Sequence, residues 1–136
     1  MTKVHFLSLA FAAALVAAPA SAQTLSAHLG GAGSPDTDGA GHATIKIDAA
    51  KNEICTDLMV EKIAPATMAH IHKAPAGASG PVAVPLAKPD AAGKSSACAT
   101  VGAEVVKDIL ANPAGYYVNV HNAEFPAGAV RGQLSR

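Results

Sequence analysis

The chain has 136 residues, with ten basic and ten acidic side chains, no tryptophan and two cysteines. After residue 22 the balance is nine basic against ten acidic residues, which gives a net charge of −1 with neutral histidines. Such a balance argues against nucleic acid or an anionic membrane as a partner, because both require a cationic surface. A chain of this length suits a single domain.

The first 22 residues have the pattern of an export signal. Lys3 supplies a positive start, Phe6 to Ala18 form an apolar run, and Ala20-Ser21-Ala22 has the A-x-A form of a cleavage site. The run is too short for a membrane-spanning helix, which needs about 20 residues. We therefore expect a signal peptide at 1–22 and a mature domain at 23–136. The product would be periplasmic or secreted, with no membrane attachment after cleavage.

Short alternating segments separated by Gly, Pro, Asp and Ser predict eight strands. In chain order they fall at 24–29, 43–48, 53–60, 67–72, 81–86, 95–101, 116–121 and 129–134. One helix is expected at 103–111, where apolar residues form a stripe and Asn112-Pro113 ends it. These elements predict an all-β fold, an antiparallel Greek-key-like sandwich or barrel with one short helix. Val, Ile, Leu and Ala must build its core, since few aromatic residues are present.

The two cysteines predict a disulfide. In the oxidising compartment of an exported protein, Cys55 and Cys98 are expected to pair and to close a loop of about 44 residues. A cysteine-containing metal site is the alternative, but neither a CxxC nor a CxH spacing is present.

Three histidines predict a metal site. His70 and His72 are one residue apart on a predicted strand, so their side chains share a face. In the segment 117–121, Val118 and Val120 point inward, which leaves His121 on the opposite face. If the two strands are neighbours, the three imidazoles converge. Imidazole suits copper, zinc, iron and nickel, and three such ligands with an open position can make a reactive or exchangeable site.

Further ligands come from nearby patterns. Met68 shares a face with His70 and His72, and a thioether beside imidazoles favours copper. Met68 and His72 are four residues apart, about 13 Å along an extended strand, so the more ordinary expectation for Met68 is a core or gap-filling residue. His42 and His28 also lie on polar faces of their strands, and either could supply a fourth ligand. Of these two, His42 is the better candidate.

Two other polar residues are expected near the site. Asn119 could orient a ligand ring, or its amide could instead cap a neighbouring loop. Arg131 could steer an anion toward the site, although an ion pair with Glu124 or Asp57 is the more ordinary expectation. The sequence contains no phosphate loop, nucleophile elbow or EF-hand loop.

Four motifs together resemble a known family. They are Ala69 to His72, Gly80 to Leu86, Tyr117 to His121, and Pro126 to Leu134. Their order and spacing resemble the CHRD domain, first described in chordin, over essentially all of Gln23 to Arg136. The resemblance implies an all-β domain in a small exported bacterial protein, and it implies no particular activity. One departure is Lys73, where the family usually has glycine.

A more distant similarity is to copper-zinc superoxide dismutase. That family also places two copper ligands as His-x-His on one strand and another in a late Val-His strand. The long loop that carries its bridging and zinc histidines is missing here, so the similarity is an analogy.

These observations support three hypotheses. The first is a binding or carrier protein for a metal ion, copper with zinc as the alternative, held by His70, His72 and His121. The second is an extracellular interaction module that contacts another exported protein and binds no metal. The third, and least favoured, is a dismutase-like copper redox enzyme.

Overall fold

The computed structural model describes residues 13–16 and 21–136. The predicted signal peptide falls mostly on residues outside this part. The described residues form β1 (Gln23–Gly30), β2 (Ala40–Asp48), β3 (Glu53–Glu61), β4 (Ala66–Lys73), β5 (Val82–Leu86), β6 (Lys94–Thr100), α1 (Ala103–Ala111), β7 (Tyr116–Asn122) and β8 (Val130–Gln133). Each predicted strand is present with its ends within three residues, and the helix has the predicted bounds.

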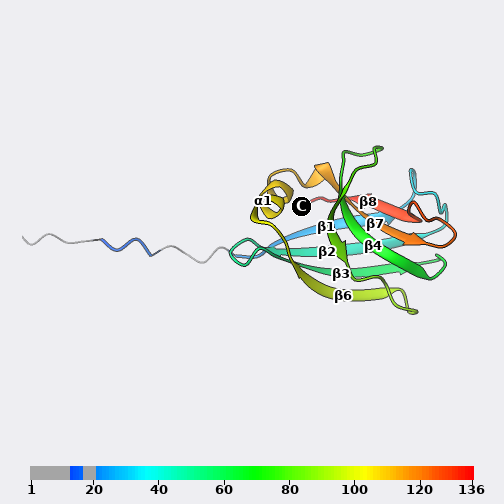
Figure 1. Ribbon diagram of the computed structural model, residues 1–136, viewed down its shortest axis with the longest axis horizontal. Coiled ribbons are helices and arrows are strands. Elements are labelled where there is room, and N and C mark those ends of the chain that lie inside the picture. The colour runs from blue at the N-terminus through cyan, green and yellow to red at the C-terminus, as the bar shows by residue number, and fades with distance from the viewer. Residues whose placement is uncertain (1–12, 17–20) are drawn as a thin grey trace, which may run out of the picture.

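The strands form two antiparallel sheets that pack face to face (Figure 1). Sheet A has the order β1-β2-β3-β6, and sheet B has the order β5-β4-β7-β8. An isolated bridge between Ser26 and Ser135 connects β1 to the chain after β8. The predicted all-β sandwich is confirmed. A closed barrel is wrong, because one bridge does not continue the hydrogen-bond ladder from one sheet into the other.

The core lies between the sheets and consists mainly of aliphatic residues. Alternation places one face of each central strand inward, as expected for antiparallel sheets with a covered inner face. The contributing residues on the central strands are fully buried: Ala43, Ile45 and Ile47 on β2, Ile54 on β3, Ile71 on β4, and Val118 and Val120 on β7. The expectation of a core built from Val, Ile, Leu and Ala is confirmed.

Strand β7 departs from this alternation, because all seven of its residues are buried. Its outward-facing side chains, Tyr117, Asn119 and His121, therefore lie under other parts of the chain. Two connections cover them, the β4–β5 connection at 74–81 and the β7–β8 connection at 123–129. Their main chains accept hydrogen bonds from side chains of sheet B. The outer face of sheet B is thus a partly enclosed polar layer.

Helix α1 lies beside the end of the sandwich where the C-terminus is found (Figure 1). Val106 and Ile109 are its buried residues. Asp108 on its other side accepts a hydrogen bond of 2.6 Å from the Lys73 ammonium and another from the Tyr116 hydroxyl. These contacts attach the helix to the ends of β4 and β7.

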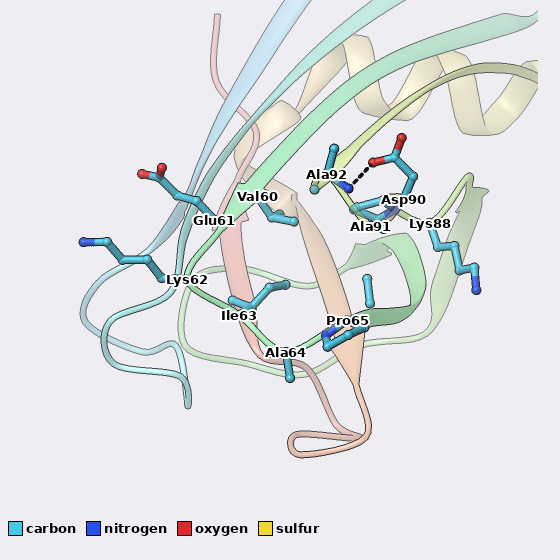
Figure 2. A pocket seen from close by; sticks show the side chains of 13 residues that line it. Val60, Glu61, Lys62, Ile63, Ala64, Pro65, Lys88, Asp90, Ala91 and Ala92 are labelled. Atoms are coloured by element: carbon cyan, nitrogen blue, oxygen red, sulfur yellow. Dashed lines mark hydrogen bonds between the residues drawn. The ribbon is translucent and has the colours of Figure 1, made fainter.

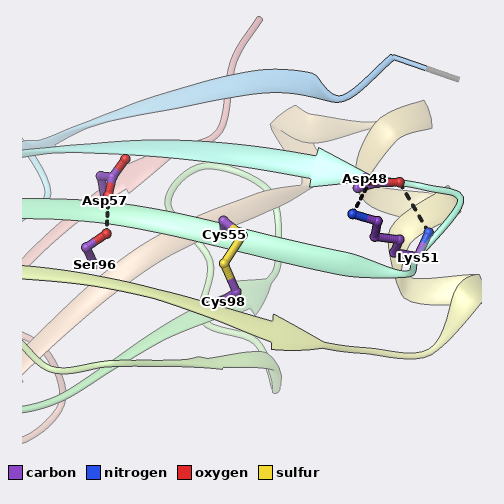
Figure 3. The surroundings of a disulfide bond; sticks show 6 residues. All are labelled: Asp48, Lys51, Cys55, Asp57, Ser96 and Cys98. Atoms are coloured by element: carbon purple, nitrogen blue, oxygen red, sulfur yellow. Dashed lines mark hydrogen bonds and ion pairs between the residues drawn. A yellow bond between two sulfur atoms is a disulfide. The ribbon is translucent and has the colours of Figure 1, made fainter.

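The predicted disulfide between Cys55 and Cys98 is confirmed (Figure 3). The two cysteines are direct partners in the register of β3 and β6, on the outer face of sheet A. A hydrogen bond from Ser96 to Asp57 lies beside the disulfide on the same pair of strands. The bridge therefore fixes the edge strand β6 to the centre of its sheet.

Candidate metal centre

The three predicted histidines come together on the outer face of sheet B. Strands β4 and β7 are antiparallel neighbours, with Met68 opposite His121 and His70 opposite Asn119. This register places His121 diagonal to His70, while His72 lies two residues further along β4. One ring nitrogen from each histidine can be chosen so that all three lie within 4.8 Å of one another.

The spacing of the rings fits a shared metal ion. Their centroids are 5.5 Å apart for His70 and His72, 5.1 Å for His70 and His121, and 5.8 Å for His72 and His121. An imidazole bound at about 2.0–2.1 Å has its centroid about 3.2 Å from the metal, so trigonal or tetrahedral ligands have centroids about 5.2–5.5 Å apart. The observed spacings differ from this range by a few tenths of an ångström. Small side-chain rotations would complete the coordination.

Two of the rings are oriented by main-chain carbonyls of the covering connections. The Nδ1 atom of His72 lies 2.9 Å from the Gly80 carbonyl oxygen, and that of His121 lies 3.0 Å from the Pro126 carbonyl oxygen. A carbonyl only accepts, so both Nδ1 atoms carry the proton and donate. Each Nε2 atom keeps its lone pair. Metal-binding histidines show this same arrangement, with the distal nitrogen donating to a carbonyl.

The clearest indication of a bound ion comes from His72. Its Nε2 atom is buried and has no hydrogen-bond partner in the described part of the protein. Leaving a buried acceptor unsatisfied costs about 1–3 kcal/mol. Native proteins satisfy most such groups, and an exception calls for a water molecule or an ion. A metal ion between the three rings would satisfy this nitrogen.

His70 is the most accessible of the three residues. Its Nδ1 atom lies 3.2 Å from Nε2 of His121, so in the metal-free protein the two nitrogens share one hydrogen bond. Burial, followed by the neighbouring charges of His121 and His72, lowers the pKa of His70 below its usual value. The ring is therefore neutral at pH 7 and can donate a lone pair. Its partial exposure also leaves the outer side of the cluster open.

Tyr117 packs against His72, its direct cross-strand partner. Its ring is stacked on His72, with centroids 5.0 Å apart and an angle of 9° between the planes. The Arg131 guanidinium lies 3.7 Å from the centroid of the same ring. His72 and Arg131 come from strands on opposite sides of β7, so the tyrosine ring lies between them. Its hydroxyl accepts a hydrogen bond of 3.3 Å from the Gly80 amide.

Arg131 does not form the ion pair expected with Glu124 or Asp57, and that expectation is wrong. Its guanidinium donates instead to the Ala78 carbonyl oxygen at 2.8 Å. The stacking position over Tyr117 directs the side chain toward the 74–81 connection and away from either carboxylate. Arg131 therefore holds the connection that orients His72.

Asn119 has the second of its two expected roles. Its amide nitrogen donates to the Ala127 carbonyl oxygen at 3.2 Å, within the 123–129 connection. That connection also supplies the Pro126 carbonyl that orients His121. Asn119 therefore acts on the cluster indirectly. It holds Ala127, the residue that follows Pro126, whose carbonyl orients the His121 ring.

The two additional ligand candidates have different positions. Met68 lies directly opposite His121 in the register and two residues from His70, and 49% of its surface is exposed. The expectation of a core residue is therefore wrong, and the Met68 thioether lies at the rim of the cluster. His42 lies on β2 in sheet A, where its ring packs against His28 with centroids 5.0 Å apart. The structure does not bring His42 to the cluster.

The carbonyls of Gly80 and Pro126 and the stacking ring of Tyr117 were missed by sequence reasoning. Main-chain acceptors have no sequence signature of their own. The only available signals were the turn-forming residues in the connections, Gly80-Pro81 and Pro126. Ser34 is a further supporting residue that the sequence did not indicate. Its hydroxyl accepts a hydrogen bond of 3.2 Å from the main-chain amide of Arg131.

A cavity of about 490 Å³ lies away from this cluster (Figure 2). The β3–β4 and β5–β6 connections line it, largely with alanine, proline and main chain, and its lining contains no histidine. The side chains of Glu61, Lys62 and Lys88 extend outward from it (Figure 2). No set of polar groups converges there, so the histidine cluster is the better candidate site.

The fold and the site together define a class of protein. It is an all-β sandwich that carries a three-histidine cluster on the outer face of one sheet. The family model for the CHRD domain matches residues 25–134, and the chain belongs to this family. Comparisons with curated proteins and with solved structures found no match. The described residues contain no helix that is long and apolar enough to cross a membrane.

We expect Gly80→Ala to weaken metal binding by about 10- to 100-fold, the usual effect of losing a group that orients a ligand. A Cβ atom at residue 80 would overlap the Lys73 carbonyl oxygen and touch the Ala74 side chain. The 74–81 connection would have to shift, and the hydrogen bond to His72 would be lost. Metal titration against a competing chelator measures the effect. The matched control is Ser79→Ala, an exposed neighbour, and equal weakening in both variants would contradict the assignment.

Proposed function

We propose that this CHRD protein binds a transition metal ion through His70, His72 and His121. The buried, unpartnered Nε2 atom of His72 carries the proposal. It lies in a cluster whose ring spacing and carbonyl-oriented tautomers fit metal coordination. Small side-chain rotations would bring the three ring nitrogens onto a common ion without any change in the strands that carry them.

Copper is the proposed ion, with zinc as the alternative. Three imidazoles serve either metal, but copper binds nitrogen ligands more tightly than zinc in the general order of divalent ions. Met68 adds a preference for Cu(I), because thioether sulfur is a soft ligand. Its half-exposed side chain lies beside both His70 and His121.

A carrier or binding role fits the site better than catalysis. The cluster opens to solvent at His70, and among the described residues its three rings make hydrogen bonds to one another and to main-chain carbonyls but to no carboxylate. An open coordination position allows a ligand from another exported protein to approach and exchange the ion. The disulfide fits folding in an oxidising compartment, which for this chain we propose is the periplasm or the extracellular medium.

Metal analysis of the mature protein tests the proposal directly. We expect about one equivalent of tightly held copper in the protein purified from an oxidising compartment, and none in His70→Ala/His72→Ala. Circular dichroism of both proteins confirms that the variant is folded. A folded wild-type protein that contains no metal and takes none up on titration would overturn the proposal. The histidines would then be structural, and an interaction module would be the better interpretation.

We expect the metal-free protein to lose stability as the pH falls below about 6.5. The pKa of His70 is lowered in the folded state, so below its usual value of 6.5 the unfolded chain binds the proton more readily. Above that pH both states are neutral and this contribution does not change. Urea unfolding between about pH 8 and pH 5 measures it, and His70→Gln should show a smaller loss on acidification. An identical pH dependence of stability in both proteins would contradict a lowered pKa of His70 in the folded state.

A further inference from the structure

A second group of possible metal ligands lies on the opposite side of the sandwich. His28, His42 and Met59 are consecutive partners across β1, β2 and β3, and all three point outward from sheet A. The inward neighbours on these strands, such as Ala27 and Ala43, are buried in the core. The three side chains therefore form a row across adjacent strands, separated from the His70 cluster by the full thickness of the sandwich.

The two histidines are spaced like ligands of one ion. Their ring centroids are 5.0 Å apart, with an angle of 59° between the ring planes. Two imidazoles bound to a common tetrahedral ion have centroids about 5.2 Å apart. Neither ring makes a hydrogen bond among the described residues. Their nitrogens are therefore available, at the cost only of displacing water.

The methionines point to copper independently. Both methionines in the described part of the chain are half exposed, 48% for Met59 and 49% for Met68, so their thioether groups are accessible to an ion. Each is the direct cross-strand partner of a histidine, His42 for Met59 and His121 for Met68. Side chains in such a pair have Cβ atoms about 4.5–5.5 Å apart, within reach of a shared ion. Thioether with imidazole is the ligand set that copper, and Cu(I) above all, prefers.

A hollow of about 500 Å³ begins beside His42 and Met59. Asp57, Asp90 and Lys94 also line it. An ion held by the two histidines would lie at its edge, with room for a further ligand from solvent or from a copper-donating molecule. The hollow therefore keeps the row accessible.

We propose that His28, His42 and Met59 form a second, weaker copper site on the outer face of sheet A. It binds Cu(I) through two imidazoles and a thioether. No main-chain carbonyl orients its rings, and both lie at the surface, so its ligands must be ordered when the ion binds. Its affinity is consequently lower than that of the His70 cluster, and its exchange is faster. The site stands on its own residues and does not require the first site to bind metal.

Anaerobic Cu(I) titration with a colorimetric chelator tests the second site. We expect the wild-type protein to bind two equivalents, and His28→Ala/His42→Ala to bind one with the tighter affinity unchanged. Both histidines are outward-facing, so this variant should fold normally. Met59→Leu, which keeps the size and polarity of the side chain, should weaken the second equivalent at least tenfold for Cu(I) and leave zinc binding unchanged.

The control and the reciprocal variant make the test decisive. Thr24→Ala/Lys46→Ala alters another cross-strand pair on the same face of β1 and β2, and it should retain both equivalents. His70→Ala/His72→Ala/His121→Ala should still bind one Cu(I), with shifts of the ring resonances of His28 and His42. A weaker second equivalent that persists in His28→Ala/His42→Ala, or a wild-type protein that binds only the tight equivalent, would overturn the inference. Absence of the tight equivalent alone would instead contradict the proposed function of the His70 cluster.

Discussion

His72→Ala is expected to weaken metal binding by more than about 100-fold, equivalent to about 2.8 kcal/mol. The variant removes one of three nitrogen ligands and leaves the ion with His70 and His121. It also removes the ring that both Gly80 and Tyr117 hold in place. The remaining two ligands would bind no better than an exposed pair. Competition with a chelator of known affinity measures the loss.

The stability of the metal-free protein distinguishes a ligand from a structural histidine. His72→Ala gives up the stacking on Tyr117 and the hydrogen bond to Gly80, but it also removes a buried nitrogen with no partner. These effects oppose each other, and we expect the net change in the free energy of unfolding to stay within about 1 kcal/mol. One equivalent of copper should raise the thermal midpoint of the wild-type protein by clearly more than that of the variant.

His28→Ala is the matched control for this experiment. It removes an imidazole from the other sheet, so the affinity of the tight site should equal that of the wild-type protein. If His72→Ala binds the first equivalent of metal as tightly as His28→Ala does, the assignment of the site is incorrect. A large loss of stability without any loss of affinity would show that His72 is structural.

Sequence periodicity predicted the histidine cluster because alternation determines the face on which a strand residue lies. His70 and His72 had to share a face, and the inward valines of β7 placed His121 on the corresponding face. What periodicity could not establish was that β4 and β7 are neighbours, since 42 residues (74–115) lie between the end of β4 and the start of β7. That pairing is non-local and depends on how the whole sandwich is assembled.

The failures of the sequence analysis have a related cause. His42 lies on a polar face, as predicted, but that face belongs to the other sheet. The prediction of an ion pair for Arg131 was based on charge alone. In the structure the guanidinium is held by the Tyr117 ring and by the main-chain carbonyl of Ala78. The sequence analysis also missed that the 74–81 and 123–129 connections cover the outer face of sheet B. A segment of Ala, Gly and Pro shows that a loop exists but not which surface it covers.

Replacing both cysteines is expected to have the largest effect on stability. Cys55→Ala/Cys98→Ala removes a link that closes a loop with a sequence separation of 43 residues, and the chain-entropy model gives a loss of about 3–4 kcal/mol. Alanine is preferable to chemical reduction, because free thiolates would themselves bind copper. Urea or thermal unfolding measures the loss. The control is Ser96→Ala, which removes the exposed hydrogen bond to Asp57 beside the disulfide and should cost less than about 1 kcal/mol.

The same double variant tests whether the tight site depends on the distant sheet. The disulfide joins β3 and β6 in sheet A, whereas the His70 cluster is built by β4, β7 and the two connections that cover them. At a temperature where the variant is folded, its affinity for the first equivalent of metal should therefore match that of the wild-type protein. A much weaker affinity in the folded variant would mean that packing across the core positions the histidine rings. Unchanged affinity would mean that the strands and connections of sheet B are sufficient to position the three histidines, and that the disulfide contributes to stability alone.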